Sequence, residues 1–204
     1  MSDVRLALTF DAEHGSRSGA DHSSPARILD ALQAAGVRAT FFVQGRWATA
    51  FPSLARRIAD DGHLVGNHSN YHAPMTLLSP AGVVRDVREA EHRIADVTGA
   101  EPRPWFRCPF GDGEDDARVR EALTELGYRI VPWNLDSGDW RDEATPEAVE
   151  AEVVDQVTTR GDSAWLVLLH SWPRSTAEAL PGVLARLAER GAQFVTVEEA
   201  MGGA

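Results

Sequence analysis

Acidic, basic or histidine residues directly follow five short apolar runs in this sequence. The five stretches, in chain order, read LTFDAEHG, HLVGNHSNYH, WFRCPFG, VPWNLDSGDW and WLVLLHSW. If the apolar runs are parallel strands of a βα barrel, their carboxyl ends meet at one face, where such enzymes keep their chemistry. Polar turns explain any one stretch, but loop polarity alone does not predict five. We therefore expect Asp11, His68, Arg107, Asp136 and His170 to surround one pocket.

Two histidines in the second stretch have the spacing of metal ligands. His68 and His72 are four residues apart, so a helical segment would place both imidazoles on one face. Such a pair is a good clamp for Zn²⁺, a borderline ion that favours nitrogen ligands. Taken alone, two surface or capping histidines are the more common explanation. A catalytic zinc site also needs a third protein ligand and an open position for water, and the acidic residues of LTFDAEHG offer that ligand.

The remaining stretches offer an acid and a cation. A lone histidine after an apolar run, as at His170, is usually a hydrogen-bonded edge residue. A nearby Asp139 would fix its tautomer and raise its pKa, which makes a general acid. Arg107 either pairs with a structural carboxylate or holds Asp11 ionised and oriented. Cys108 is expected to be a packed small residue. Three tryptophans suit the core, a sugar-binding face or a dry acyl pocket: Trp133, Trp140 and Trp172.

The composition limits the classes of partner and of chemistry. The chain has 204 residues, 43% of them hydrophobic, which suffices for a single domain over 1–204 with a sizeable core. A formal net charge of -11 argues against nucleic acids and anionic membrane surfaces as partners. All 20 basic residues are arginine, which excludes a Schiff-base lysine, and a single cysteine excludes an internal disulfide. No run is long enough to span a membrane, and Met1–Asp3 lacks the basic start of a secretion signal, so we expect a cytoplasmic protein.

The elements that must position these residues alternate between strands and helices. Strands are expected at Val4–Phe10, Arg38–Val43, His63–Asn67, Pro104–Phe106, Arg129–Trp133, Trp165–Leu169 and Gln193–Val197. Between them we expect helices, three of which have their N-cap and first helical residue in a Ser-Pro or Thr-Pro pair and most of which stop at a glycine. The N-caps are Ser24, Ser79 and Thr145, and two of the stops are Gly36 and Gly99. The last long helix has Pro181 near its start. About seven such units favour a parallel (β/α) barrel, with an open doubly wound sheet as the alternative. The first strand has no glycine-rich phosphate loop after it, which argues against nucleotide binding.

The order of the five stretches resembles that of the polysaccharide deacetylases with the NodB homology fold, carbohydrate esterase family 4. The resemblance extends from Leu6 to about Val197, and the five family motifs are matched by TFD, HSNYH, RCPFG, DSGDW and LLH. The phrases GVRATFFVQG and GHLVGNHS also look like the framework of that family. The resemblance implies an α/β fold, a distorted (β/α) barrel that usually has seven strands. It also implies a divalent metal, commonly zinc, and hydrolysis of an N-acetyl group.

Roles for individual residues follow from the same resemblance. By position, Asp11 would be the general base, His170 the general acid and Asp139 the residue that tunes His170. His68 and His72 would bind the metal. Arg107 would orient Asp11, and the backbone N–H of Phe110 would help to bind the oxyanion. Trp140 and Leu168 would line the pocket for the acetyl methyl.

The first motif departs from the family pattern. The usual motif has two adjacent aspartates, the second being a metal ligand, and here Ala12 stands in that place. Some relatives use a D-x-D or D-x-E arrangement, which Glu13 fits. In a regular strand Asp11 and Glu13 share one face while His14 points the other way, so we expect Glu13 as the third ligand. A loop bend would reverse this preference, and a site of two histidines with a weakened metal, or none, is the remaining alternative.

The sequence as a whole predicts a metal-dependent hydrolase that removes an N-acetyl group from an amino sugar, an oligosaccharide or a polysaccharide. Zinc is the expected metal, although Co²⁺, Ni²⁺ and Fe²⁺ suit the same ligands. Two alternatives stay open. One is a hydrolase of a small non-sugar amide on the same fold. The other is a carbohydrate-binding module with a degenerate site, for which Ala12 is the evidence. The substrate is thus a small molecule or a glycan, and the sequence says nothing about the oligomeric state.

Overall fold

The computed structural model describes residues 4–15, 20–160 and 164–202. Met1–Asp3, on which the predicted lack of a secretion signal rests, lies outside the described residues. The chain falls into two compact units, one made of Met1–Thr40 and Trp133–Ala204 and the other of Phe41–Pro132. Among the described helices, none has both the length and the apolar character that crossing a bilayer requires.

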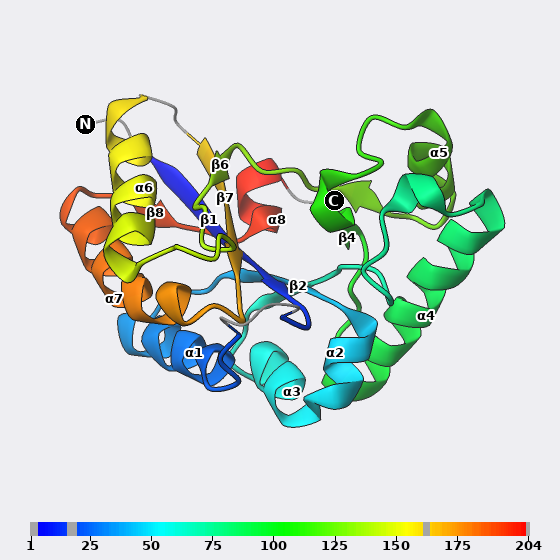
Figure 1. The fold of residues 1–204 in the computed structure, drawn as a ribbon, viewed down its shortest axis with the longest axis horizontal. Helices are drawn as coiled ribbons and strands as arrows, with labels where there is room; N and C mark the ends of the chain where they lie inside the picture. Colours follow the sequence, from blue (N-terminus) through cyan, green and yellow to red (C-terminus); the bar gives the residue numbers. More distant parts are fainter. Residues whose placement is uncertain (1–3, 16–19, 161–163, 203–204) are drawn as a thin grey trace. The chain divides into compact units, whose positions relative to one another are not determined.

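The first unit consists of parallel strands and the helices that pack on them (Figure 1). Its strands are β1 (Arg5–Ala12), β6 (Leu135–Asp136), β7 (Ala164–His170) and β8 (Gln193–Phe194). Its helices are α1 (Ser24–Ala35), α6 (Pro146–Thr159), α7 (Arg174–Glu189) and α8 (Val197–Met201). β7 pairs in parallel with β1 and with β6, and β8 pairs in parallel with β1. α7 packs against both α1 and α6.

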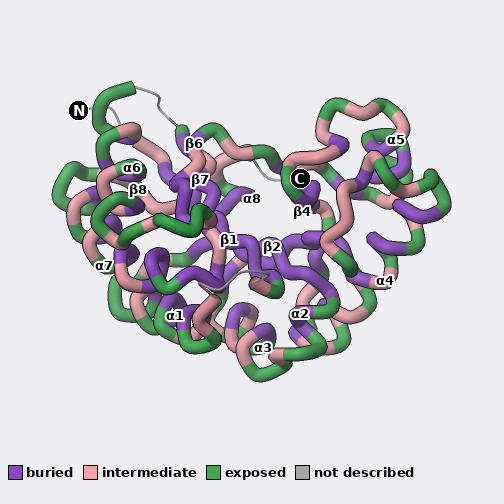
Figure 2. The backbone as a smooth tube through the Cα atoms, in the orientation of Figure 1, coloured by how far each residue is buried: buried purple, intermediate pink, exposed green. Residues whose placement is uncertain are grey.

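β1 and β7 are the central strands of this unit. Every residue of β1 after Arg5 is buried, as expected for a parallel strand that is covered on both faces. Buried residues concentrate along the strands, and exposed ones on the helices (Figure 2). The register places Leu6 beside Trp165 and Asp11 beside His170. The two strands therefore end with a carboxylate and an imidazole as neighbours.

The second unit has the same kind of build. Its strands are β2 (Thr40–Val43, of which Thr40 belongs to the first unit), β3 (Leu64–Asn67), β4 (Trp105–Phe106) and β5 (Arg129–Ile130). Its helices are α2 (Gly45–Ala50), α3 (Pro52–Asp60), α4 (Pro80–Thr98) and α5 (Ala117–Glu125), with two 3-10 turns, η1 (Met75–Leu77) and η2 (Pro109–Gly111). β4 pairs in parallel with β3 and β5, and α4 packs against α2, α3 and α5. An apolar cluster joins α4 and α5 to β4 and includes Val83, Val87, Phe106, Val119 and Leu123.

The predicted helix boundaries are confirmed where a cap is present. Ser79 and Thr145 accept hydrogen bonds from backbone N–H groups in the first turns of α4 and α6. Gly36 and Gly99 adopt the left-handed conformation directly after α1 and α4, which a glycine reaches without steric cost. α1 begins at Ser24 itself, one residue earlier than predicted.

Two predicted strands are shorter than expected. The strand predicted at Arg129–Trp133 ends at Ile130, because Pro132 has no N–H to donate to a ladder, and a separate strand, β6, follows it. The strand predicted at Gln193–Val197 ends at Phe194. α8 begins at Val197 instead, since Thr196 forms a capping box with Glu199.

Two further differences concern helices. α2 was not predicted, because its six residues carry too short an apolar pattern. Pro181 lies in the interior of α7 rather than near its start. A proline there removes one hydrogen bond of the helix. The buried face of α7, which includes Leu180, Val183 and Leu184, compensates because packing stabilises helices more than intrinsic propensity does.

Candidate active site

Asp139 and His170 form a buried hydrogen-bonded pair in the first unit. Oδ1 of Asp139 lies 2.8 Å from Nδ1 of His170, and Oδ2 accepts the backbone N–H of His170 at 2.7 Å. Thr176, in the first turn of α7, donates its hydroxyl to the same Oδ2 at 2.6 Å. The Asp139 side chain is fully buried, whereas 12% of the His170 side chain is exposed. The carboxylate is thus fixed by three donors, and the imidazole keeps access to solvent.

This pairing sets the charge of the imidazole. Burial alone would lower the pKa of His170, but Coulombic attraction to Asp139 and the hydrogen bond between them outweigh burial. The negative charges of Glu13 and Asp11 add to the effect, and the pKa rises from 6.5 to about 9. At neutral pH His170 is therefore a cation that can release a proton, which is the state a general acid requires.

Two carboxylates lie at the end of β1 in the same unit. Asp11 is paired in register with His170 and is 4% exposed. β1 ends one residue before Glu13, so Glu13 does not hold the regular strand position from which its orientation was predicted. Its side chain is still buried, at 8% exposed, and its Oε1 accepts a hydrogen bond from Nε1 of Trp172 at 3.1 Å. His14 is exposed.

Trp140 and Leu168, the residues predicted for the acetyl pocket, are both neighbours of Asp136 in β6. Leu168 is 4% exposed and lies beside Asp136 in the register of β6 and β7. The indole Nε1 of Trp140 donates to the two carboxylate oxygens of Asp136 at 3.1 and 3.3 Å. Asp136, which the sequence placed among the polar residues at strand ends, therefore fixes the orientation of this indole.

In the second unit, His68 and His72 lie on a loop after β3 and not on a helix. Ser69 and His72 have φ values of 62° and 56°, which interrupt helical geometry. The loop nevertheless brings the two rings together, with centroids 4.9 Å apart. Nδ1 of His68 lies 3.0 Å from the carbonyl oxygen of Arg107. A carbonyl only accepts hydrogen bonds, so in the neutral ring Nδ1 carries the proton and Nε2 is the nitrogen that can bind a cation.

Two buried residues, Asn67 and Asp86, hold this loop, and neither was predicted from the sequence to have a role. Oδ1 of Asn67 accepts the backbone N–H of Ser69 at 2.9 Å, and its Nδ2 donates to the Tyr128 hydroxyl at 3.0 Å. Asp86, on α4, accepts two consecutive backbone N–H groups of the loop at 2.9 and 3.1 Å, and burial raises its pKa. The sequence signal for Asp86 is an acidic residue among the buried positions of an amphipathic helix.

Arg107 and Phe110 lie on the segment that follows β4. Arg107 is fully buried, its guanidinium lies 4.2 Å from the ring centroid of Phe42, and its Nε donates to a backbone carbonyl at 3.3 Å. Phe110 has a φ of 60°, and its exposed ring meets the His72 ring edge-on at 4.4 Å. Between them, Cys108 is buried, and burial raises the pKa of its thiol to about 12. It is a packed thiol, as predicted, because a nucleophile would need a lower pKa.

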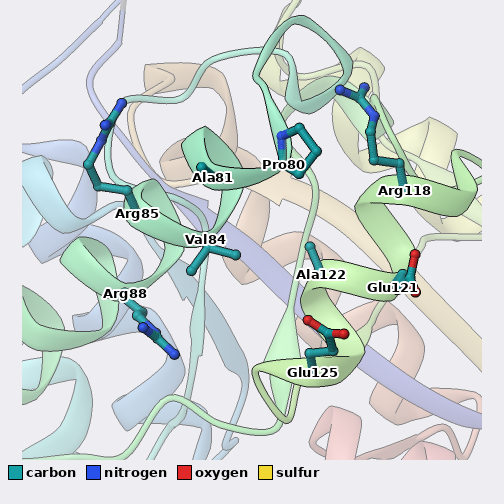
Figure 3. A pocket seen from close by; sticks show the side chains of 9 residues that line it. All are labelled: Pro80, Ala81, Val84, Arg85, Arg88, Arg118, Glu121, Ala122 and Glu125. Atoms are coloured by element: carbon teal, nitrogen blue, oxygen red, sulfur yellow. The ribbon is translucent and has the colours of Figure 1, made fainter.

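A hollow between α4 and α5 is lined by none of the predicted catalytic residues (Figure 3). One of its arginines, Arg118, donates to the carbonyl oxygens of Thr76 and Leu78 at 3.0 and 2.8 Å and so anchors η1. The hollow is otherwise lined by the sides of the two helices, with exposed charged residues such as Arg85 and Glu121. We interpret it as a solvated surface and assign no chemistry to it.

Comparison with known proteins identifies the family. Residues 1–131 match the family model described as polysaccharide deacetylase. Peptidoglycan-N-acetylglucosamine deacetylase PgdA of Listeria monocytogenes is 31% identical over 98% of this chain, which spans 40% of the length of PgdA. A family 4 carbohydrate esterase from Streptomyces lividans, solved in complex with acetate, has a TM-score of 0.80 and 31% identity over 96% of this chain and 93% of its own. A CE4 family pseudoenzyme from Bacillus anthracis has a TM-score of 0.84 and 27% identity over 98% of this chain and 66% of its own.

This chain belongs to the polysaccharide deacetylase family, carbohydrate esterase family 4. The predicted fold class, the NodB-type distorted (β/α) barrel, is confirmed by the similarity to these structures. The chain spans less than half of the length of PgdA.

Proposed function

We propose that this chain is a metal-dependent deacetylase that hydrolyses the N-acetyl group of an amino sugar in a glycan. The observation that carries the proposal is the buried Asp139–His170 pair beside Asp11 at the ends of β7 and β1. Amide hydrolysis needs both a base and an acid, because one proton must leave the attacking water and another must reach the leaving nitrogen. Family membership and the activities for which the relatives are named support the same reaction.

We further propose, from the match to the family motifs, that Glu13, His68 and His72 hold the metal. The donor set fits, since two imidazole nitrogens and one carboxylate are three protein ligands that leave a position open on a four-coordinate zinc ion. The bond of His68 Nδ1 to a carbonyl oxygen fixes the tautomer whose Nε2 can ligate. When bound, Zn²⁺, or Co²⁺, Ni²⁺ or Fe²⁺, supplies Lewis acidity that polarises the acetyl carbonyl and lowers the pKa of water.

In this proposal two side chains move the protons. Asp11 takes a proton from water as the water oxygen forms a bond to the carbonyl carbon. His170, whose pKa is raised by its pairing with Asp139, gives its proton to the amide nitrogen as the carbon–nitrogen bond breaks. The products are acetate and a free amine, and proton exchange with solvent restores Asp11 and His170. Asp139 keeps the imidazole oriented throughout.

Four residues are proposed to position the substrate and the base. Arg107 orients Asp11. The backbone N–H of Phe110 binds the oxyanion. The hydrogen bonds of η2 are donated by the two residues after Phe110, so this turn does not use the Phe110 N–H as a donor. Trp140 and Leu168 line the pocket for the acetyl methyl. The indole of Trp140 is fixed on its carboxylate partner and Leu168 is buried in β7, so both side chains present defined surfaces.

We propose a glycan as the substrate in preference to a small non-sugar amide. PgdA acts on N-acetylglucosamine in peptidoglycan according to its name. In the second unit, Tyr71 precedes His72 in the sequence and the Phe110 ring contacts the His72 ring. Tyr71 and Phe110 are 54% and 68% exposed. Exposed aromatic rings suit the apolar faces of sugar rings.

A binding module without activity is the second candidate. Ala12 favours it, because this buried residue carries no ligand atom where the usual motif has an aspartate, and one similar structure is named a pseudoenzyme. The intact pair of Asp139 and His170, together with Asp11, favours the enzyme, since a module without catalysis has no need of a charged imidazole beside a carboxylate.

The test is acetate release from N-acetylglucosamine oligomers by metal-free protein reloaded with each of the four metals. We expect release with Zn²⁺, loss of activity on chelation and loss in Asp11→Asn with the metal retained. Release from small N-acetylated amines but not from the oligomers would favour the non-sugar alternative. No release with any metal or substrate would favour the binding module.

A further inference from the structure

We propose that Trp172 is a positioning residue that sets the metal affinity of the site by fixing Glu13. The inference rests on the proposed function, in which Glu13 is a metal ligand. Trp172 lies two residues after LLH, the match to the last family motif. Its indole Nε1 donates to Oε1 of Glu13 at 3.1 Å in a buried contact. An indole N–H only donates, so it holds a carboxylate oxygen without competing for a cation.

The departure in the first motif explains why this chain needs such a residue. The usual ligand would stand on β1 at the position of Ala12, whose side-chain direction the strand fixes. Glu13 follows the end of β1 and has a longer side chain, with more rotamers to lose when a ligand binds. A hydrogen bond to Oε1 removes much of that freedom before binding. Outer partners of ligating carboxylates act in this way at metal sites in general.

Trp172 is itself firmly held. Its side chain is 9% exposed, and its carbonyl oxygen accepts the backbone N–H of Asp21 at 3.0 Å. The next residue, Pro173, forms a β-bridge with Ala20. A Cβ placed on Gly15 would lie 3.2 Å from Cγ of Trp172 and 2.5 Å from Cβ of Ala20, so only glycine lets the chain pass this close to the indole. The indole is therefore a fixed donor.

The test compares two tryptophan-to-phenylalanine variants in metal-free protein. Trp172→Phe keeps an aromatic ring and removes the N–H, and we expect the Kd for Zn²⁺, measured by chelator competition, to rise about 10- to 100-fold. Trp165→Phe is the matched control. Trp165 is fully buried on β7, and its Nε1 finds no acceptor among the residues that the structure describes, so the Kd should not change. Circular dichroism establishes that both variants fold, and the visible spectrum of bound Co²⁺ should change only in Trp172→Phe.

A second background separates this inference from the proposed function. In Glu13→Ala, the further change Trp172→Phe should leave the Kd for Zn²⁺ where Glu13→Ala alone puts it. If Glu13→Ala weakens binding but Trp172→Phe does not, the positioning role is wrong and the ligand assignment stands. An equal loss from Trp172→Phe with and without Glu13 also overturns the positioning role. If Glu13→Ala leaves the Kd unchanged, the ligand assignment is wrong, and the role of Trp172 falls with it.

Discussion

Asp139→Asn tests whether Asp139 raises the pKa of His170, the proposed general acid. The substitution keeps the shape of the side chain and removes the charge that does most to raise the pKa of His170. In the variant, burial still lowers that pKa, and only the more distant charges of Glu13 and Asp11 oppose it. We therefore expect the pKa of His170 to fall from about 9 toward its ordinary value of 6.5.

The expected loss of activity follows from the protonated fraction of His170. At pH 8, a histidine with a pKa of about 9 is roughly 90% protonated, whereas one with a pKa of 6.5 is roughly 3% protonated. The supply of general acid at pH 8 therefore falls about 30-fold in Asp139→Asn, while at pH 5 the two proteins are both protonated. The deficit in kcat/KM should grow as the pH rises.

Two measurements check this reasoning. An NMR titration of metal-free protein, with the His170 ring signal assigned from a His170→Gln sample, gives the pKa directly in both proteins. A pH–rate profile of the metal-loaded proteins shows whether the alkaline limb moves to lower pH in the variant. A His170 that titrates near 6.5 in the unmodified protein, or at the same pH in Asp139→Asn, would refute the account of the charged pair.

Three further predictions concern stability and the histidine loop. The pKa of His170 in the folded protein exceeds its unfolded value of 6.5, so protonated His170 contributes about 3 kcal/mol to the free energy of unfolding. This contribution is present below pH 6.5 and is lost as the pH rises through about 9. Urea unfolding of metal-free protein at pH 6 and pH 10 should show the decrease. Thr176→Val removes one donor from the buried Asp139 and should cost roughly 1–3 kcal/mol in the same assay, with no change in the Kd for Zn²⁺. Asp86→Ala removes the acceptor of two backbone N–H groups beside His72 and should raise the Kd for Zn²⁺, whereas Asp86→Asn should raise it less. An unchanged Kd in Asp86→Ala would show that Asp86 does not support the histidine loop.

The parts of the fold that the sequence predicts are those with local causes. Ser79 and Gly99 delimit α4 because a side-chain cap and a left-handed glycine act within one turn. The apolar run before His170 identifies a buried parallel strand without reference to its neighbours. Pro132 ended a predicted strand early for an equally local reason, and the capping box of Thr196 was a readable signal that the prediction of a strand overlooked.

The parts of the site that the sequence could not predict depend on tertiary contacts. The four-residue spacing of His68 and His72 suggested a helix, but the backbone between them forms a loop whose N–H groups donate to buried Asp86 on α4. Glu13 was placed by strand alternation, yet it lies past the strand end, where its carboxylate accepts a hydrogen bond from Trp172, far away in the sequence. No local pattern encodes either partner, whereas the order of the five motifs identified the family.

Retention of Zn²⁺ together with loss of acetate release in Asp11→Asn tests the central claim most directly. The substitution keeps the size of the side chain beside His170 and removes the group proposed to accept a proton from water. Measured on one preparation by elemental analysis and acetate detection, the account predicts a Zn²⁺ content equal to that of the unmodified protein and no acetate above the metal-free control. Near-normal acetate release from this variant would contradict it.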